Sequence, residues 1–236
     1  MSEEPLESKH FTWYSRVTAV FVTALIISNI IAVKLIDIFG IVLPAAVILF
    51  PISYIIGDVL TEVYGFSRAR QAIWTGFFCN LVAVIAIWVA GILPPASFWS
   101  VVGFTSSDVA QQAYVAILGF TPRLLMASFL AYLAGEFLNA VVLAKLKLAT
   151  SGRNLWLRTI SSTIVGQGVD SLVFITVAFA GILPAGALQA AILSQWAFKT
   201  IYEAIATPLT YLVVNALKRA EGVDYFDRET KFTPIG

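Results

Sequence analysis

Six runs of mostly apolar residues constrain this chain most, because each is close to the ~20 residues that a helix needs to cross a bilayer. They cover residues 17–39, 43–63, 72–93, 123–146, 157–183 and 190–216. The chain is 59% hydrophobic and only 12% charged, a balance that the surface of a soluble domain would not tolerate. The sequence therefore predicts an all-α membrane protein, with six transmembrane helices in one domain that spans residues 1–236.

Lysine and arginine gather in alternate polar segments of the chain. Arg68 and Arg70 lie in the second connection, and others lie in the leader, the fourth connection and the tail. Only Lys34 and Arg123 approach the opposite face. Because cytoplasmic loops retain positive charge, we expect both termini in the cytoplasm and the helices paired as three hairpins. The long connection 94–122 then lies outside, and we expect it to carry a short helix on the membrane surface.

Four of the apolar runs each carry polar residues on one helix face. In the last run they recur every fourth residue, which keeps them on one side of the helix. Because lipid accepts none of these groups, the four faces are expected to surround a shared polar cavity. The polar residues of these faces are Asp58 and Glu62; Ser128, Tyr132, Glu136 and Asn139; Thr163, Gln167 and Asp170; and Gln195, Lys199, Glu203 and Thr207.

Several of these residues have a structural interpretation beside the functional one. Asp170 and Lys199 both fall ~15 to 20 Å into the membrane, so they could pair, either to lock two helices or to serve binding. Glu62 could instead reach interfacial water or pair with Arg68. Asn29, Asn80 and Asn139 could bond between helices. Trp196 and Tyr202 are candidates for stacking on a flat ring. The apolar wall of a pocket is expected to include Phe50, Tyr54, Phe174 and Trp196.

Composition also excludes some functions. The only cysteine is Cys79 and the only histidine is His10, so an intrachain disulfide is excluded and sites built on histidine or cysteine for metals are nearly excluded. There is no basic block for nucleic acid, and no nucleophile stands beside a base. No segment matches the phosphate-binding pattern Gly-x-x-x-x-Gly-Lys, so ATP would act only through another subunit. We therefore expect no enzyme, no catalytic residue, no metal and no cofactor.

Five segments in order resemble the queuosine precursor transporter family. They are Ser28-Asn29; Phe50-Pro-Ile-Ser-Tyr-Ile-Ile-Gly-Asp-Val-Leu-Thr-Glu-Val-Tyr-Gly65; Arg123 before Ala127-Ser-Phe-Leu-Ala-Tyr-Leu-Ala-Gly135; Gly166-Gln-Gly-Val-Asp-Ser171; and Phe198-Lys199 before Pro208-Leu-Thr-Tyr211. The resemblance implies a six-helix protein of the inner (plasma) membrane, related in fold to the substrate-binding components of vitamin uptake systems. It also implies import of 7-cyano- and 7-aminomethyl-7-deazaguanine, with queuine left open.

Two mechanisms remain open for such a protein. The first is alternating access around a polar midplane cavity, and the second is a capture subunit of an ATP-driven, vitamin-type uptake system. The expected partners are a small 7-deazapurine and the lipid bilayer, and a homo-oligomer is left open. The candidate substrate-binding residues are Asn29, Tyr54, Asp58, Glu62, Arg123, Glu136, Asn139, Gln167, Asp170, Trp196, Lys199, Tyr202 and Glu203.

Overall fold

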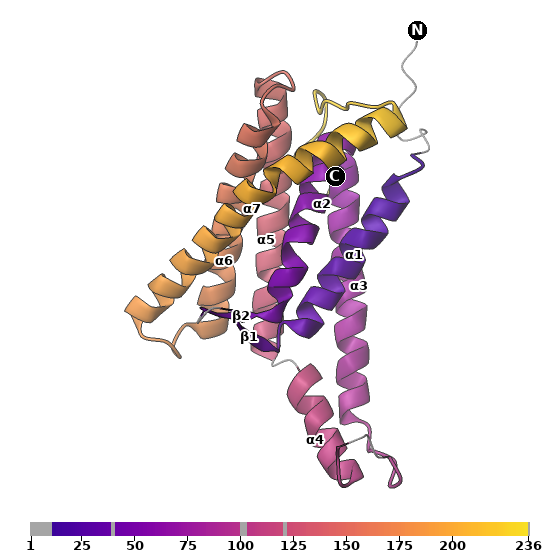
Figure 1. Cartoon of the computed structure of the whole chain (residues 1–236), viewed down its shortest axis with the longest axis vertical. Coiled ribbons are helices and arrows are strands. Elements are labelled where there is room, and N and C mark those ends of the chain that lie inside the picture. Colours follow the sequence, from indigo (N-terminus) through magenta and orange to yellow (C-terminus); the bar gives the residue numbers. More distant parts are fainter. Residues whose placement is uncertain (1–10, 39–40, 100–102, 120–121, 236) are drawn as a thin grey trace.

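The computed structural model describes residues 11–38, 41–99, 103–119 and 122–235, and these are mostly helical (Figure 1). The first two helices are separated by a short β-hairpin and a 3₁₀ turn (Ala45–Ile48). The strands of the hairpin are β1 (Leu35–Ile38) and β2 (Ile41–Pro44). The helices are α1 (Tyr14–Ile31), α2 (Phe50–Tyr64), α3 (Phe66–Ile92), α4 (Ser107–Leu118), α5 (Pro122–Ala149), α6 (Leu155–Phe179) and α7 (Ala185–Glu221).

The predicted helical class is confirmed, and within the described residues four helical segments are long and apolar enough to cross a membrane. They are α1, α3, α6 and the segment Ser107–Ala149, which includes α5. α2 has only 15 residues, and α7 carries the polar stripe of Lys199 and Glu203. Membrane crossing by α2 and α7 therefore stays a prediction.

The prediction of one helix over residues 17–39 is wrong at its end. α1 stops at Ile31, and residues 35–38 pair antiparallel with 41–44 instead. Isoleucine and valine make up half of each strand, and β-branched residues favour the extended backbone over the helix. The second run, predicted from residue 43, likewise becomes α-helical only at Phe50, where Pro51 lies in the first turn and needs no N–H partner.

Apart from the short α4, the helices run alternately up and down, so α1 begins and α7 ends at the same end of the bundle (Figure 1). The backbone N–H of Trp13 donates to Glu221 Oε1 at 2.6 Å there. We call this end the Glu62 end, after the residue at its centre, and the opposite end the Arg123 end.

The closest helix contact in the bundle joins α5 to α6. A Cβ atom built on Gly166 would lie only 2.8 Å from the carbonyl oxygen of Gly135, and one on Gly135 would meet Asp170. Two glycines facing each other let the backbones touch, as is typical of helix pairs in membranes. The close approach of α5 and α6 fixes the positions of Asp170 and Asn139, which lie beside the two glycines.

α4 is the short helix that the sequence predicted in the long connection. The Ser106 hydroxyl accepts the N–H of Val109 and so caps the first turn. Gln111 Nε2 donates to the Gly91 carbonyl at 2.7 Å, which fastens α4 to the last turns of α3. The placement of this helix at a membrane surface stays a prediction.

Labelling of introduced cysteines tests the predicted orientation. In a background with Cys79→Ala, Ser106→Cys should react with an impermeant thiol reagent outside intact cells, whereas Arg153→Cys should react only after permeabilisation. The reason is the bias of lysine and arginine toward the Glu62 end. Both positions are exposed, so access to the reagent is limited by the membrane alone. The reverse labelling pattern would invert the topology.

Candidate functional site

A cavity of about 400 Å³ lies among α1, α2, α3, α5, α6 and α7. Its volume is within the range of small-molecule sites. Side chains that line it come from all six helices and mix apolar walls with a few polar groups. Of the thirteen candidate residues, the cavity brings together Asn29, Tyr54, Glu136, Asp170 and Lys199.

The ion pair between Asp170 of α6 and Lys199 of α7 is present, as the equal depth of the two residues suggested. The side chains are only 16% and 12% exposed, so the pair is largely shielded from solvent. Lys199 Nζ also lies 5.5 Å from the centre of the Tyr54 ring, within cation–π range. The pair therefore places one cation on the cavity wall, between a carboxylate and an aromatic face.

Glu136 of α5 supplies a carboxylate to the same cavity and is 5% exposed. A Cβ atom on Gly57 of α2 would lie 3.1 Å from Glu136 Oε2, so the carboxyl group packs against the α2 backbone. Asp170 and Lys199 are close enough to act on it electrostatically. The cavity thus holds an acceptor group beside the ion pair.

Two asparagines contribute amide groups from the other side of the cavity. Asn29 Nδ2 of α1 donates to Asn80 Oδ1 of α3 at 3.0 Å, so the bond between helices that the sequence left open is present. Each amide has both donor and acceptor atoms, so this bond leaves the Asn29 carbonyl and further N–H groups for a ligand. Both residues line the cavity, although the sequence pointed only to Asn29 as a binding residue.

Aromatic and aliphatic residues form the rest of the wall. Phe174, expected as a wall residue, is joined by Phe21, Phe129 and Tyr132. The Tyr132 hydroxyl donates to the Ile73 carbonyl at 2.9 Å, which fixes its ring. Phe21 lies in an apolar run without a polar stripe, so nothing in the sequence distinguishes it from a residue that faces lipid.

Eight candidate residues lie outside this lining, and four of them are Arg123, Gln167, Trp196 and Tyr202. Arg123 donates to the carbonyls of Val177 and Ala180, at 2.7 and 2.5 Å, and so caps the end of α6. The Trp196 indole donates to the Ile164 carbonyl at 2.9 Å. Gln167 is buried and Tyr202 is half-buried, both outside the lining. A role of these four in substrate binding stays a prediction.

Asp58, Asn139 and Glu203 form a second polar group, about one turn from the cavity toward the Glu62 end. They follow Tyr54, Glu136 and Lys199 along α2, α5 and α7, and all three are at most 4% exposed. Asn139 Nδ2 donates to Asp58 Oδ1 at 2.6 Å. This is the bond between helices that the sequence left open for Asn139.

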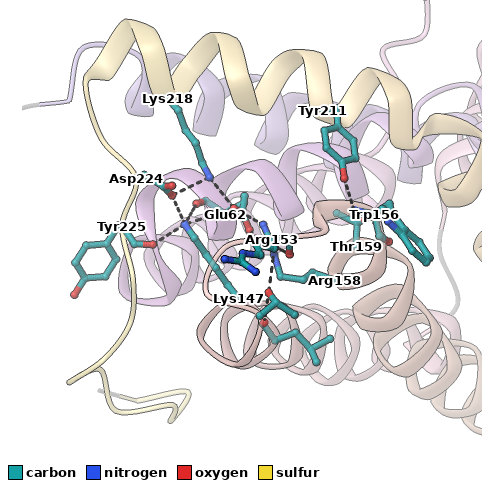
Figure 2. A network of polar contacts seen from close by, with 12 residues as sticks. Glu62, Lys147, Arg153, Trp156, Arg158, Thr159, Tyr211, Lys218, Asp224 and Tyr225 are labelled. Atoms are coloured by element: carbon teal, nitrogen blue, oxygen red, sulfur yellow. Dashed lines mark hydrogen bonds and ion pairs between the residues drawn. The ribbon is translucent and has the colours of Figure 1, made fainter.

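Glu62 lies at the centre of a network of charges that closes this end of the bundle (Figure 2). Arg158 of α6 binds both of its carboxylate oxygens, at 2.8 and 3.2 Å. Lys218 of α7 binds Oε1 at 2.8 Å, and Lys147 of α5 lies 3.5 Å from it. Glu62 is fully buried, and one carboxylate thereby joins four helices. None of these three partners was indicated by the sequence.

The C-terminal tail completes this network, which we define as Glu62, Lys147, Arg158, Lys218 and Asp224. Lys147 and Lys218 bind Asp224 Oδ1 at 2.6 and 2.8 Å. Burial alone would raise the pKa of Asp224, but the hydrogen bonds from the two lysines outweigh it and hold the pKa below its usual value. Asp224 therefore stays ionised near neutral pH and shares the two lysines with Glu62.

Asp227 extends the contact of the tail to α3. Its carboxylate accepts the backbone N–H of Phe66 at 3.0 Å, at the first residue of the helix. A carboxylate at that position satisfies a free N–H group and complements the helix dipole. No local sequence pattern predicts this contact, because the two residues are 161 positions apart.

Comparison with known proteins identifies relatives of this chain. Residues 44–213 match a family model described as "Putative vitamin uptake transporter". A "Probable queuosine precursor transporter" of Bacillus subtilis (strain 168) is 32% identical over 199 residues, which are 84% of this chain and 83% of that protein. The "Queuosine precursor transporter" of Escherichia coli (strain K12) is 28% identical over 55% of this chain and 52% of its own. No solved structure gives a significant match.

Proposed function

Because this chain belongs to the queuosine precursor transporter family, we propose that it imports 7-deazaguanine bases by alternating access around the cavity. The family consists of transporters, so the protein is a multi-pass transporter of the plasma membrane and not an enzyme. The candidate substrates are 7-cyano- and 7-aminomethyl-7-deazaguanine, with queuine as a further candidate. The observation that carries this proposal is the cavity, which places a carboxylate, an ammonium group and amides within aromatic walls.

The chemistry of the cavity fits the edge of such a base. Adjacent N–H donors of a deazaguanine suit the carboxylate of Glu136, which accepts two hydrogen bonds at once. The ring carbonyl needs a donor, which Lys199 or the free amide N–H groups of Asn80 supply. Tyr54 and Phe174 offer faces for the flat ring. A few polar groups within an apolar wall are typical of small-molecule sites.

Movement of substrate through the bundle requires the Glu62 network to separate. The network lies beyond the cavity, at the end that carries most of the lysines and arginines, and joins α2, α5, α6 and α7. If this end is cytoplasmic, the described conformation is closed toward the cytoplasm. Alternating access then needs a second conformation in which these contacts open.

Reconstitution separates this mechanism from an ATP-driven capture subunit, which the comparisons do not favour. Purified protein alone in liposomes should move labelled 7-cyano-7-deazaguanine across the membrane. Binding without any movement would point to a missing energising module.

Exchange of the cavity carboxylate for an amide tests the substrate contact. Glu136→Gln should weaken binding of 7-cyano-7-deazaguanine by about 2 kcal/mol, or roughly thirtyfold, because a charged acceptor is lost from a buried pair. Titration of purified protein, with guanine and adenine as comparison ligands, measures this change. Asp108→Asn on exposed α4 is the matched control and should bind as the unaltered protein does. If Glu136→Gln, Asp58→Asn and Glu203→Gln all bind the substrate as the unaltered protein does, a carboxylate does not recognise the substrate.

A further inference from the structure

Asp58 and Glu203 are two buried carboxyl groups that form no ion pair with a cation among the described residues. They are 1% and 2% exposed, and they act on each other electrostatically across the contact of α2 with α7. Asp58 Oδ2 and Glu203 Oε1 are both buried and have no hydrogen-bond partner among the described residues. A buried carboxylate oxygen without a donor is costly, and two negatively charged carboxylates side by side are costlier still.

The neighbouring groups do not relieve this cost. Asn139 donates to Asp58 Oδ1 only, while its own Oδ1 is buried without a partner among the described residues. The hydroxyls of Thr61 and Thr207 donate to backbone carbonyls of their own helices, at 3.0 and 2.9 Å. The amide and hydroxyl groups beside the pair therefore do not supply the missing hydrogen bonds.

The charged groups around the pair are engaged elsewhere or repel it. Glu62 on α2 and Glu136 on α5 face Asp58 and add like charge. Lys199, one turn before Glu203 on α7, is bonded to Asp170 of α6. Lys147, Arg158 and Lys218 bind Glu62, one turn beyond Asp58. The Asp58–Glu203 pair thus lies between two sets of paired charges, and within the part of the chain that the structure describes it has no counter-ion of its own.

We propose that Asp58 and Glu203 share a proton, and that this pair is the proton-binding site that couples uptake to the pH gradient. One O–H then donates to the facing carboxylate, which satisfies both orphaned oxygens with a single hydrogen bond. The pair lies between the cavity and the Glu62 network. Its protonation state therefore changes the strength of the contact between α2 and α7. Coupling rests on the proposed transport function, but the proton site does not.

Infrared spectroscopy tests the site without substrate. The purified protein at neutral pH should show the carbonyl stretch of a protonated, buried carboxyl group. This band should lose intensity in both Asp58→Asn and Glu203→Gln and persist in the control Asp108→Asn. A pH titration of the unaltered protein gives a second reading that needs no variant to fold, because the band should disappear at high pH. Absence of any such band at neutral pH in the unaltered protein would overturn the proposal.

Liposomes test the coupling. With an interior more alkaline by one pH unit, the unaltered protein should accumulate 7-cyano-7-deazaguanine up to about tenfold, the limit for one coupled proton. Asp58→Asn and Glu203→Gln should lose this accumulation, and Asp108→Asn should keep it. Equal accumulation in all four proteins, or accumulation that follows a sodium gradient instead, would overturn the coupling. Failure of the unaltered protein to bind substrate, with the infrared band present, would reject the proposed substrate and leave the proton site.

Discussion

Replacing Glu62 with glutamine is expected to destabilise the protein by on the order of 3 to 5 kcal/mol, because it removes the carboxylate that three cations share and leaves the buried Arg158 uncompensated. Arg158 and Lys147 are 1% exposed, so neither can recover the lost interaction from water. Asp224 still binds both lysines, but no carboxylate then remains on Arg158 among the contacts that the structure describes. Thermal unfolding in detergent should show a large fall in midpoint.

Two further variants make this expectation specific. Glu229→Gln removes a carboxylate from the exposed part of the tail and should change the midpoint little. Arg158→Met should cost less than Glu62→Gln, because Glu62 keeps Lys147 and Lys218. A loss in Arg158→Met larger than that in Glu62→Gln would show that Glu62 is not the centre of the network.

Removal of either partner of the Asp170–Lys199 pair should abolish uptake. Asp170→Asn and Lys199→Met each leave one charge within the membrane, which costs on the order of 3 to 5 kcal/mol if it stays ionised. The double variant leaves neither charge, so its expression and thermal stability should recover. Uptake should remain absent in it, because both side chains line the cavity.

Measurement of stability and uptake for the four proteins distinguishes the two roles of this pair. Full recovery of uptake in the double variant would reduce the pair to a clamp between α6 and α7. Strictly additive losses in stability would contradict the contact itself, since residues that touch give non-additive effects. An intermediate result, with stability restored and uptake absent, is the one we expect.

The helical class was predictable because it depends on local sequence. The length of the apolar runs gave α3, α5 and α6 within a few residues, apart from an earlier start of α3 at Phe66. The distances of Asp170 and Lys199 from the ends of their helices placed both at a similar depth, which indicated that they could pair. The end of α1 was missed, because an isoleucine-rich segment suits a buried helix and a strand equally well until its pairing partner is known.

The candidate site was predictable only in part. Polar residues in apolar runs have a strong signal, and Glu136, Lys199 and Asn29 reach the cavity as expected. The presence of a polar residue in an apolar run does not indicate which other side chains it contacts in the bundle. Asp58 and Glu62 are one turn apart on α2, yet one lies in an uncompensated carboxyl pair and the other binds three cations.

The sequence by itself determined that the chain is a helical membrane protein with inward polar faces, because length, hydropathy and periodicity are properties of single segments. Apart from the Asp170–Lys199 pair, only the tertiary structure decided which charges meet. The donors that bind the side chain of Glu62 are 96 and 156 residues away, and the one that binds its carbonyl oxygen is 85 residues away. No spacing rule reaches across such distances. They are set by the close approach of α5 and α6 at Gly135 and Gly166 and by the return of α7 across the Glu62 end.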